Sequence, residues 1–360
     1  METNNISAAE LIKKKGLIIA GPCSAENEEQ LLKTATEIKS IGKVDMLRAG
    51  IWKPRTNPGG FEGAGVKGLS WLLKAKQITG LKTTVEVATA KHVEDALSFD
   101  VDVLWIGART TVNPFSVQTI AEALKGTNVP VLIKNPVNPD IKLWIGAIER
   151  LRRAGIENIG IIHRGFSSYG NTEFRNVPMW QIPIEMKRLF PELPLICDPS
   201  HICGKRDTIL SVSQKSIDLD YDGLIIESHY DPDSAMTDKE QQLNADQLDK
   251  LLKKLIWKTS SSNTKEYLNK LDNLREQINH LDEELLALIS NRMNVAKEIG
   301  EIKKTNKITV LQSSRYSEII ERALSKGEQV GLSNDFIKMY LEAIHIESIR
   351  IQNLLQVNHS

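Results

Sequence analysis

Cationic residues recur directly after short apolar segments in the first 257 residues of the chain. They stand in RAG and the KPRT that follows it, in GAR, in IKN and in HRG, and they are Arg48, Lys53, Arg109, Lys134 and Arg164. A single arginine is more often part of a surface salt bridge, but independent surface roles would not place five cations at equivalent points. Guanidinium and ammonium groups that converge on one opening bind strongly anionic ligands, phosphorylated ones above all. The set therefore predicts a site for phosphorylated substrates.

Four residues of the kinds that bind metals follow such segments too. They are Cys23 in GPCS, His201 in CDPSH, Glu227 in ESH and Asp238 in HYDPDSAMTD. Thiolate, imidazole and carboxylate donors together suit one first-row divalent ion, Mn, Fe, Co or Zn, and not Mg or Ca. The chain has 3 cysteines, an odd and sparse set that indicates reduced thiols available as ligands. Because the four residues are scattered along the sequence, a buried cysteine and an ordinary core histidine are the alternative interpretation.

Eight short apolar, β-branched segments would have to position these side chains. The segments are LIIAG, DMLRAG, KTTVEV, VLWIG, VPVLIKN, NIGIIHRG, PLICD and DGLIIESH, and helical stretches separate them. Continuous apolar segments suit strands buried on both faces, and repeated strand–helix units close into a parallel (β/α)8 barrel with its active site at the carboxyl ends of the strands. A doubly wound open sheet is the alternative. No GxGxxG follows the first segment and no GxxxxGK(S/T) occurs, so the sequence carries no signal of a nucleotide-binding fold.

The periodicity changes after a polar, Ser-rich segment, KTSSSNTKE, at residues 258–266. We therefore expect a barrel domain over residues 1–257, a linker at 258–265 and an all-helical domain over 266–360. Beyond the linker, residues at alternating spacings of three and four form the seam of one long helix. They are Leu271, Leu274, Ile278, Leu281, Leu285, Leu288, Arg292, Val295, Ile299 and Ile302. Two further helices are predicted near 313–326 and 334–352, and no proline follows Pro232.

Arg292 lies on this seam, where a charge is costly unless it is paired. Arg275 and Arg292 are 17 residues apart, or about 25 Å along a helix, so one copy of the helix could not bring both to one small ligand. Lys303 follows Arg292 by 11 residues, nearly in phase and about 16 Å away. An anionic ligand held between two protomers would satisfy these observations and predicts a homodimer, or a higher oligomer, formed through the helical domain. A register-setting polar residue in a plain coiled coil is the alternative.

The motifs GPCS, KPRT, GAR, HRG, DPSH and ESH, in this order within about residues 10–257, closely resemble those of the 3-deoxy-D-arabino-heptulosonate-7-phosphate (DAHP) synthase family, type I-beta. The resemblance implies that phosphoenolpyruvate, D-erythrose 4-phosphate and water form DAHP and phosphate, which is the first step of the shikimate pathway. It implies one divalent metal ion on Cys23, His201, Glu227 and Asp238. It also implies that Arg48, Arg109, Lys134 and Arg164 bind phosphoenolpyruvate, and that Lys53, Arg55 and Thr56 meet the aldose phosphate. Glu86 would be a partner of phosphoenolpyruvate or of its water, and Lys53, Lys134 and His201 would be catalytic.

A related family, 3-deoxy-D-manno-octulosonate-8-phosphate (KDO8P) synthase, has the same barrel and uses arabinose 5-phosphate. Its corresponding loop typically reads KANRSS where this chain has KPRT, and some of its members lack the metal-binding cysteine that is present here as Cys23. Both differences favour the heptulosonate product. A KDO8P synthase or another metal-dependent aldolase is the alternative for the barrel.

The segment from about Leu271 to Gln352 resembles the all-helical chorismate mutase family, in LREQINHLDEELLALISNRMNVAKEIGEIK and in ESIRIQ. The resemblance implies the rearrangement of chorismate to prephenate. Arg275 from the partner chain, Arg292 and Arg315 would bind the two carboxylates, Lys303 and Gln352 the ether oxygen, and Ser348 another part of the ligand. The chain departs from the family in having Gln312 for the usual Asp and Tyr316 for the usual Glu. A phenol can still hydrogen-bond to a hydroxyl, so we expect altered affinity; a regulatory or dimerising module with weak mutase activity is the alternative.

The remaining features limit the classes of partner. Lys and Arg together number 46, as do Asp and Glu, so the net charge is zero and argues against a nucleic-acid or anionic-membrane surface. No apolar run has the length of a membrane span and the first residues do not resemble a signal peptide, so we expect a cytoplasmic protein. The fusion of two enzymes of one pathway leads to the hypothesis that prephenate or chorismate, bound in the helical domain, restrains the barrel by feedback.

Overall fold

The computed structural model describes residues 6–53, 59–170, 172–259 and 264–357. It divides into two compact units, Met1–Ser260 and Ser261–Ser360. We call the first the barrel unit and the second the helical unit.

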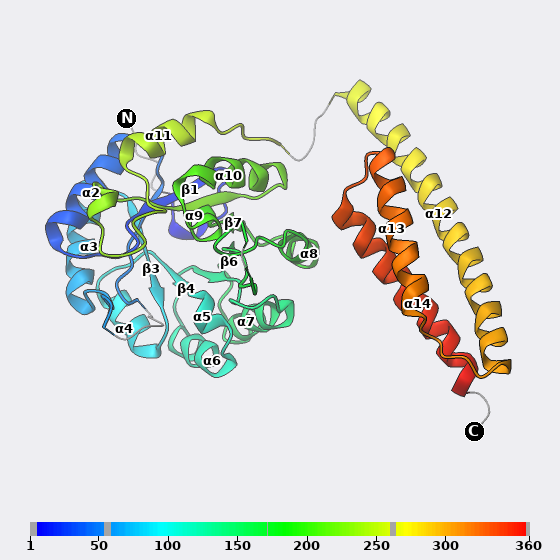
Figure 1. The fold of residues 1–360 in the computed structure, drawn as a ribbon. Coiled ribbons are helices and arrows are strands. Elements are labelled where there is room, and N and C mark those ends of the chain that lie inside the picture. The colour runs from blue at the N-terminus through cyan, green and yellow to red at the C-terminus, as the bar shows by residue number, and fades with distance from the viewer. Residues whose placement is uncertain (1–5, 54–58, 171, 260–263, 358–360) are drawn as a thin grey trace. The chain divides into compact units, whose positions relative to one another are not determined.

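Eight parallel strands of the described residues form a closed barrel in which each strand pairs with its neighbours in sequence and β8 pairs with β1 (Figure 1). The strands are β1 (Leu17–Gly21), β2 (Met46–Arg48), β3 (Lys82–Val87), β4 (Val103–Ile106), β5 (Val131–Lys134), β6 (Ile159–His163), β7 (Leu195–Cys197) and β8 (Gly223–Glu227). All eight predicted segments are confirmed as strands, and the open-sheet alternative is wrong. Because the strands are parallel, their carboxyl ends lie together at one end of the barrel, which we call the mouth.

Helices follow the strands and surround the barrel. They are α1 (Ala8–Leu11), α2 (Glu28–Ser40), α3 (Val66–Thr79), α4 (Ala90–Ser98), α5 (Ala108–Thr111), α6 (Pro114–Ala123), α7 (Ile141–Arg153), α8 (Gln181–Leu189), α9 (Pro199–Cys203), α10 (Ile209–Asp218) and α11 (Ala245–Lys254), with short 3-10 turns η1 (Arg206–Thr208) and η2 (Pro232–Ser234). Side-chain caps define several starts: Asn27 caps α2, Thr89 caps α4 and Asp140 caps α7. The sequence thus encodes these three helix starts locally.

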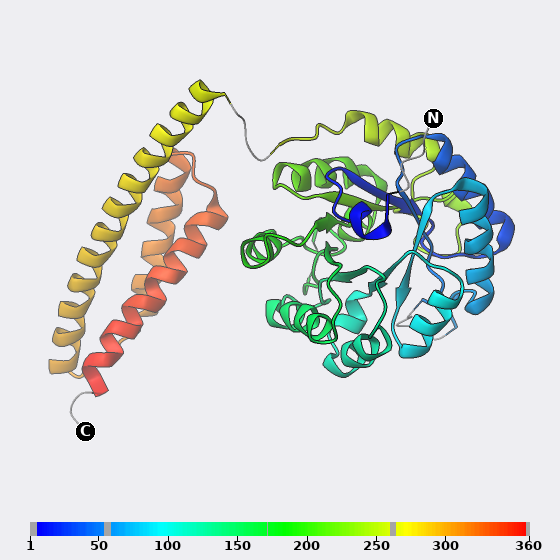
Figure 2. The ribbon, with the colours of Figure 1, turned by 180° about the vertical axis from the view of Figure 1, so that it is seen from behind.

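Two layers of apolar side chains hold the barrel together. The larger layer lies between the strands and the surrounding helices, and the smaller one fills the barrel interior. The interior includes Leu17, Trp105 and Ile225, and also Leu11 and Ile12 of the N-terminal segment. The first helix therefore closes the end of the barrel opposite the mouth, where Figure 2 shows it in blue. Burial on both faces explains why the strand sequences are apolar without alternation.

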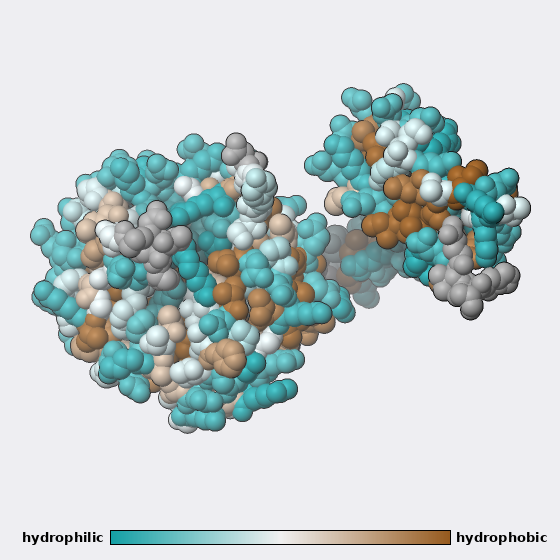
Figure 3. All heavy atoms as spheres, turned by 60° about the horizontal axis from the view of Figure 1, so that its bottom comes forward, coloured by the Kyte–Doolittle hydropathy of each residue, from teal (hydrophilic) through white to brown (hydrophobic). Residues whose placement is uncertain are grey.

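The described part of the helical unit forms three helices, α12 (Lys265–Thr305), α13 (Ser313–Gln329) and α14 (Asn334–Val357), as the sequence predicts. On α12 the buried residues are Met293, Ala296 and Gly300, all in its second half. The predicted seam is largely exposed, with Ile278 at 56% and Leu285 at 53% exposure, and Figure 3 shows apolar side chains gathered on the surface of this unit. Although α12 has 41 residues, no described helix is long and apolar enough to cross a membrane.

Candidate active sites

Three of the four candidate metal ligands lie together at the barrel mouth. Cys23 follows β1, Glu227 ends β8 and Asp238 lies on the connection between β8 and α11; one ligand atom from each lies within 4.8 Å of the others. Cys23 Sγ is 3.3 Å from Asp238 Oδ2. His201 lies in α9 beside this trio, with its Nε2 3.7 Å from Glu227 Oε1. The structure thus brings Cys23, Glu227 and Asp238 into one cluster and places His201 at its edge.

The orientation of the His201 ring is fixed from the side away from the cluster. Its Nδ1 lies 2.9 Å from the Asp198 carboxylate, which also accepts the His201 backbone N–H at 3.1 Å. A carboxylate only accepts hydrogen bonds, so Nδ1 carries the proton and the lone pair of Nε2 points toward Glu227. Burial lowers the pKa of His201, which favours this neutral form. Metal-binding histidines are commonly held in this way.

The charge of the two carboxylates also suits a cation. Burial and the neighbouring Glu227 raise the pKa of the Cys23 thiol to about 12. Burial alone would raise the pKa values of Glu227 and Asp238. Cationic groups lower both pKa values instead: Arg48 and Lys53 act on Glu227, and Arg175 acts on Asp238. Glu227 Oε1 has no hydrogen-bond partner among the described residues. Two ionised carboxylates and a thiol, which loses its proton when it binds a metal, are a donor set that a first-row divalent ion fits.

Buried cations lie next to the cluster. Arg48 is 1% exposed; its Nη2 lies 3.0 Å from Glu227 Oε1, while its Nε and Nη1 have no partner among the described residues. Lys134, 4% exposed, pairs with Asp198 at 2.7 Å, and Lys53 donates to the Cys23 carbonyl oxygen at 3.0 Å. Unpaired buried N–H groups are costly, so Arg48 is arranged for an acceptor that comes from outside the chain.

Arg164 and Arg109 extend the positive region. Burial lowers the pKa of Arg164 to about 10. Repulsion from Arg175 and Arg109 also lowers this pKa, whereas the Asp198 carboxylate raises it. Arg164 Nη1 donates to Asn176 Oδ1 at 2.6 Å, and the side chain of Arg109, on α5, is exposed. Mutual repulsion between guanidinium groups is relieved when an anion binds among them.

Glu86, on β3, is held against the barrel interior. Its Oε2 accepts from Trp105 Nε1 at 3.2 Å, and a Cβ placed on Gly107 would come within 1.9 Å of its Oε1. Gly107 is therefore needed so that the carboxylate can lie here. The two remaining predicted residues of the barrel site, Arg55 and Thr56, lie outside the described residues.

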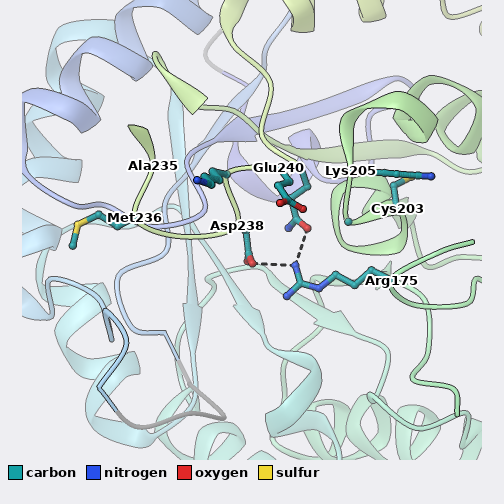
Figure 4. A pocket seen from close by; sticks show the side chains of 10 residues that line it. Arg175, Cys203, Lys205, Ala235, Met236, Asp238 and Glu240 are labelled. Carbon is teal, nitrogen blue, oxygen red and sulfur yellow. Dashed lines mark hydrogen bonds and ion pairs between the residues drawn. The ribbon is translucent and has the colours of Figure 1, made fainter. Parts of the chain in front are cut away.

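Several residues at the mouth are missed by the sequence analysis. Asp198, in the DPSH motif, orients His201 and pairs with Lys134, and its place beside His201 was an available signal. The ring of Trp105 lies under two cations, 5.3 Å from Arg48 Cζ and 5.7 Å from Lys134 Nζ. Arg175 and Gln241 line a pocket of about 730 Å³ beside Asp238, shown in Figure 4. No motif distinguishes Arg175 or Gln241 from ordinary polar loop residues.

The helical unit contains a second pocket, of about 480 Å³. Five of the predicted mutase residues line it: Arg292, Lys303, Arg315, Ser348 and Gln352. Arg292 Nη1 donates to Ser348 Oγ at 2.8 Å, and the buried side-chain oxygen of Gln352 has no partner among the described residues. Arg275 does not line the pocket; it is exposed and pairs with Asp272 at 3.3 Å. A single copy of α12 therefore leaves Arg275 away from the other five residues.

The two departures from the mutase pattern, Gln312 and Tyr316, both line this pocket. Tyr316 stacks on His345, with ring centroids 4.0 Å apart and planes 25° apart. Burial, Arg292 and Lys303 lower the pKa of His345, so this ring is neutral at pH 7. His345, which the sequence analysis misses, thus makes an aromatic wall with Tyr316 where the family usually has a carboxylate.

Known proteins match both units. The family model for the DAHP synthetase I family matches residues 11–265, and that for chorismate mutase type II matches residues 274–353. The chain is 32% identical to the phospho-2-dehydro-3-deoxyheptonate aldolase of Thermotoga maritima, over 66% of this chain and 68% of that protein. It is 28% identical to the 2-dehydro-3-deoxyphosphooctonate aldolase of Desulfotalea psychrophila, over 67% of this chain and 88% of that protein.

Solved structures agree with this relationship. The crystal structure of the Thermotoga maritima DAHP synthase superimposes with a TM-score of 0.59 at 30% identity, over 66% of this chain and 67% of that one. A truncated form of the Thermotoga maritima 3-deoxy-D-arabino-heptulosonate 7-phosphate synthase gives a TM-score of 0.56 at 28% identity, over 66% of this chain and 84% of that one. The chain therefore belongs to the DAHP synthetase I family and is a bifunctional enzyme in which a DAHP synthase barrel is followed by a chorismate mutase type II domain.

Proposed function

We propose that the barrel condenses phosphoenolpyruvate with D-erythrose 4-phosphate and water, giving DAHP and inorganic phosphate. The observation that carries the proposal is the juxtaposition of Cys23, Glu227 and Asp238 with the buried, incompletely paired guanidinium of Arg48. A cation site beside an anion site matches one substrate with an aldehyde and another with a carboxylate and a phosphate.

We assign these residues to the two substrates. Arg48, Lys134, Arg164 and Arg109 bind and orient phosphoenolpyruvate, which supplies much of the advantage of a two-substrate site. Lys53, Arg55 and Thr56 bind the aldose phosphate. The enol carbon of phosphoenolpyruvate forms the new bond to the aldehyde carbon, whose oxygen takes up a proton. Water adds at the second carbon of phosphoenolpyruvate, and the bond from this carbon to the phosphate oxygen breaks to release inorganic phosphate. Glu86, held by Trp105, accepts the proton of that water.

Cys23, His201, Glu227 and Asp238 would hold one divalent ion, Mn, Fe, Co or Zn. When bound, this ion supplies a Lewis acid that polarises the aldehyde. His201 completes the set of ligands from its place at the edge of the cluster, with Asp198 fixing its tautomer.

A KDO8P synthase is the second candidate for the barrel. It is favoured by the relatives from Geobacter and Desulfatibacillum aliphaticivorans, both 2-dehydro-3-deoxyphosphooctonate aldolases 30% identical to this chain. Phosphate release from phosphoenolpyruvate, measured separately with erythrose 4-phosphate and with arabinose 5-phosphate, distinguishes the two. We expect release with the four-carbon aldose; release with arabinose 5-phosphate alone would assign the second function.

We propose that the helical unit rearranges chorismate to prephenate in a homodimer. Arg292 and Arg315, with Arg275 of the partner subunit, bind the two carboxylates. Lys303 and Gln352 act at the ether oxygen, and Ser348 holds Arg292 and the ligand. Fixed positive charge at the breaking bond, in a pocket that keeps chorismate folded, is sufficient for a unimolecular rearrangement. The exposed apolar face of α12 supports the pairing of two copies.

Arg292→Ala tests this assignment against the alternative of a regulatory dimer module. We expect mutase turnover to be lost while phosphate release by the barrel is retained. Arg350→Ala is the matched control, because Arg350 is an exposed arginine of α14 that lines neither of the pockets that contain Arg292. Equal mutase turnover in the two variants would refute the catalytic role of Arg292.

A further inference from the structure

The two carboxylates of the cation cluster each use their two oxygens differently. Asp238 Oδ1 lies 3.0 Å from Arg175 Nη1, and Oδ2 faces Cys23 Sγ. Glu227 Oε2 accepts from Gln241 Nε2 at 2.6 Å, and Oε1 faces His201 at 3.7 Å and forms an ion pair with Arg48 Nη2 at 3.0 Å. In each group one oxygen is fixed by the protein and the other is turned toward the cluster.

Arg175 contributes to both of these restraints. Its Nη1 contacts Asp238 Oδ1 at 3.0 Å (Figure 4) and also donates to Gln241 Oε1 at 2.9 Å. Gln241 in turn donates to Glu227. One guanidinium therefore holds Asp238, on the loop after β8, directly, and holds Glu227, at the end of β8, through the buried amide of Gln241. Asp238 needs such support, because its backbone φ of 45° is in the left-handed region, which is unfavourable for residues other than glycine.

Arg175 is itself held by its surroundings. Its backbone N–H donates to the Cys203 carbonyl at 3.4 Å, and that of Asn176 donates to Ile202 at 3.1 Å. A Cβ on Gly204 would come within 2.6 Å of the Arg175 Cβ, so the missing side chain at Gly204 leaves room for the arginine. The guanidinium thus extends from an anchored backbone toward Asp238.

The next residue, Asn176, connects the same segment to the anion site. Its Oδ1 accepts from Arg164 Nη1 at 2.6 Å, and its Nδ2 donates to the His201 carbonyl at 2.6 Å. Asn176 is 7% exposed, so these bonds are shielded from water. Arg175 and Asn176 together join the segment between β6 and α8 to three candidate ligands and to one candidate phosphoenolpyruvate-binding arginine.

We propose that Arg175 is a positioning residue of the cation site, which holds one oxygen of Asp238 and, through Gln241, one oxygen of Glu227, so that the other oxygens present a preformed site. The inference rests on the proposed cation site. Outer residues that orient metal ligands typically change metal affinity by about 10- to 100-fold when they are removed. A charge effect alone would act in the opposite direction, because a cationic side chain near the site repels the metal.

The test is the affinity of the full chain for Co²⁺, measured by competition with a chelator and followed by the cobalt–thiolate absorption. We expect Arg175→Met to bind Co²⁺ about 10- to 100-fold more weakly than the unaltered chain, with a changed absorption spectrum. Lys205→Met is the matched control: Lys205 lines the same pocket and is exposed, but its side chain points away from Asp238 (Figure 4). The Lys205→Met variant should bind Co²⁺ with the same affinity as the unaltered chain.

The Arg175 side chain is 49% exposed, so its removal costs little folding stability and Arg175→Met should remain folded. Arg175→Lys provides a second variant, since it keeps the charge but cannot present a guanidinium to both acceptors; we expect it to bind Co²⁺ weakly as well. Unchanged or tighter binding by Arg175→Met would overturn the inference. Absence of Co²⁺ binding by the unaltered chain would instead overturn the proposed cation site, so the two failures are distinguishable.

Discussion

At the scale of single residues, burial determines the charge of the imidazole that lies behind the mouth. His163, at the end of β6, is fully buried; its Nε2 donates to the Pro178 carbonyl at 2.7 Å and its Nδ1 accepts from the Tyr221 hydroxyl at 2.9 Å. Both nitrogens are satisfied only when the ring is neutral. Burial accordingly lowers the pKa of His163 from 6.5 to about 3.

This pKa predicts a dependence of barrel stability on pH. Between pH 6.5 and 3 the unfolded chain binds a proton at this histidine that the folded chain does not, so the free energy of unfolding falls as the pH falls through this range. For His163 alone the loss from pH 7 to pH 5.5 is about 1 kcal/mol. All six tryptophans lie between Trp52 and Trp257, so urea unfolding followed by tryptophan fluorescence reports on the barrel unit.

His163→Gln keeps a donor for Pro178 and an acceptor for Tyr221 but does not titrate. Its free energy of unfolding should therefore lose about 1 kcal/mol less than that of the unaltered chain over the same pH interval. Identical losses in the two proteins would show that His163 is protonated in the folded state or that other groups account for the dependence.

The sequence contains strong signals for some site residues and none for others. Cys23, His201 and Glu227 stand in short motifs directly after strands, and the parallel topology brings strand ends together, so their approach was predictable. Arg175 and Gln241 lie on connections without regular spacing, and their contact depends on how two loops fold over the mouth. His345 was missed for a different reason, because a single histidine on a helix does not reveal which side chain it will stack on.

At the scale of the elements, the exposed face of α12 is the feature that most needs a partner. The helix is continuous from Lys265 to Thr305, and α14 covers only its second half, through Met293, Ala296 and Gly300. Ile278, Leu281 and Leu285 remain more than half exposed. A row of large apolar residues in water is unfavourable, and a second copy of the helix would bury it.

Ile278→Glu should therefore weaken the proposed dimer. It should also lower the mutase rate, because Arg275 of the partner subunit would be lost from the pocket. Sedimentation velocity gives the oligomeric state, and prephenate formation gives the rate. Asn279→Glu adds the same charge at the next residue, away from the seam, and should change neither. A dimer that persists unaltered in Ile278→Glu would contradict the assignment of this face as the interface.

The elements themselves could be predicted well from the sequence. Strands buried on both faces have continuous apolar sequences, and the helical unit shows a spacing of three and four, so the two types of element are distinct. Closure of the barrel follows from eight repeated strand–helix units, whereas the open-sheet alternative failed because β8 pairs with β1. The short helix α1 has no periodicity to predict it; its role at the end of the barrel depends on Leu11 and Ile12 meeting the interior.

At the scale of the whole molecule, one chain carries two enzyme units, and the fusion leads to the hypothesis of feedback. Prephenate bound in the helical unit would lower the rate of DAHP formation, with a coupling of about 1–3 kcal/mol if it is of ordinary size. Where this coupling acts on the affinity for the barrel substrates, those substrates must change the affinity for prephenate by an equal factor.

Steady-state assays of phosphate release with added prephenate test this hypothesis. We expect inhibition of about 5-fold or more at saturating prephenate, and loss of that inhibition in Arg292→Ala, in which the proposed mutase pocket lacks one of its arginines. A rate that prephenate does not change would end the feedback hypothesis without affecting either catalytic assignment.

The central claim is that a divalent ion bound at Cys23, His201, Glu227 and Asp238 serves the barrel reaction, while the helical unit needs only its own side chains. The most direct measurement is a parallel assay of phosphate release and prephenate formation by the full chain, before and after treatment with a chelator and after single metals are returned. We predict that the chelator abolishes phosphate release, that Mn, Fe, Co or Zn restores it, and that prephenate formation stays constant throughout. Undiminished phosphate release by a chain shown to be free of metal would contradict the account.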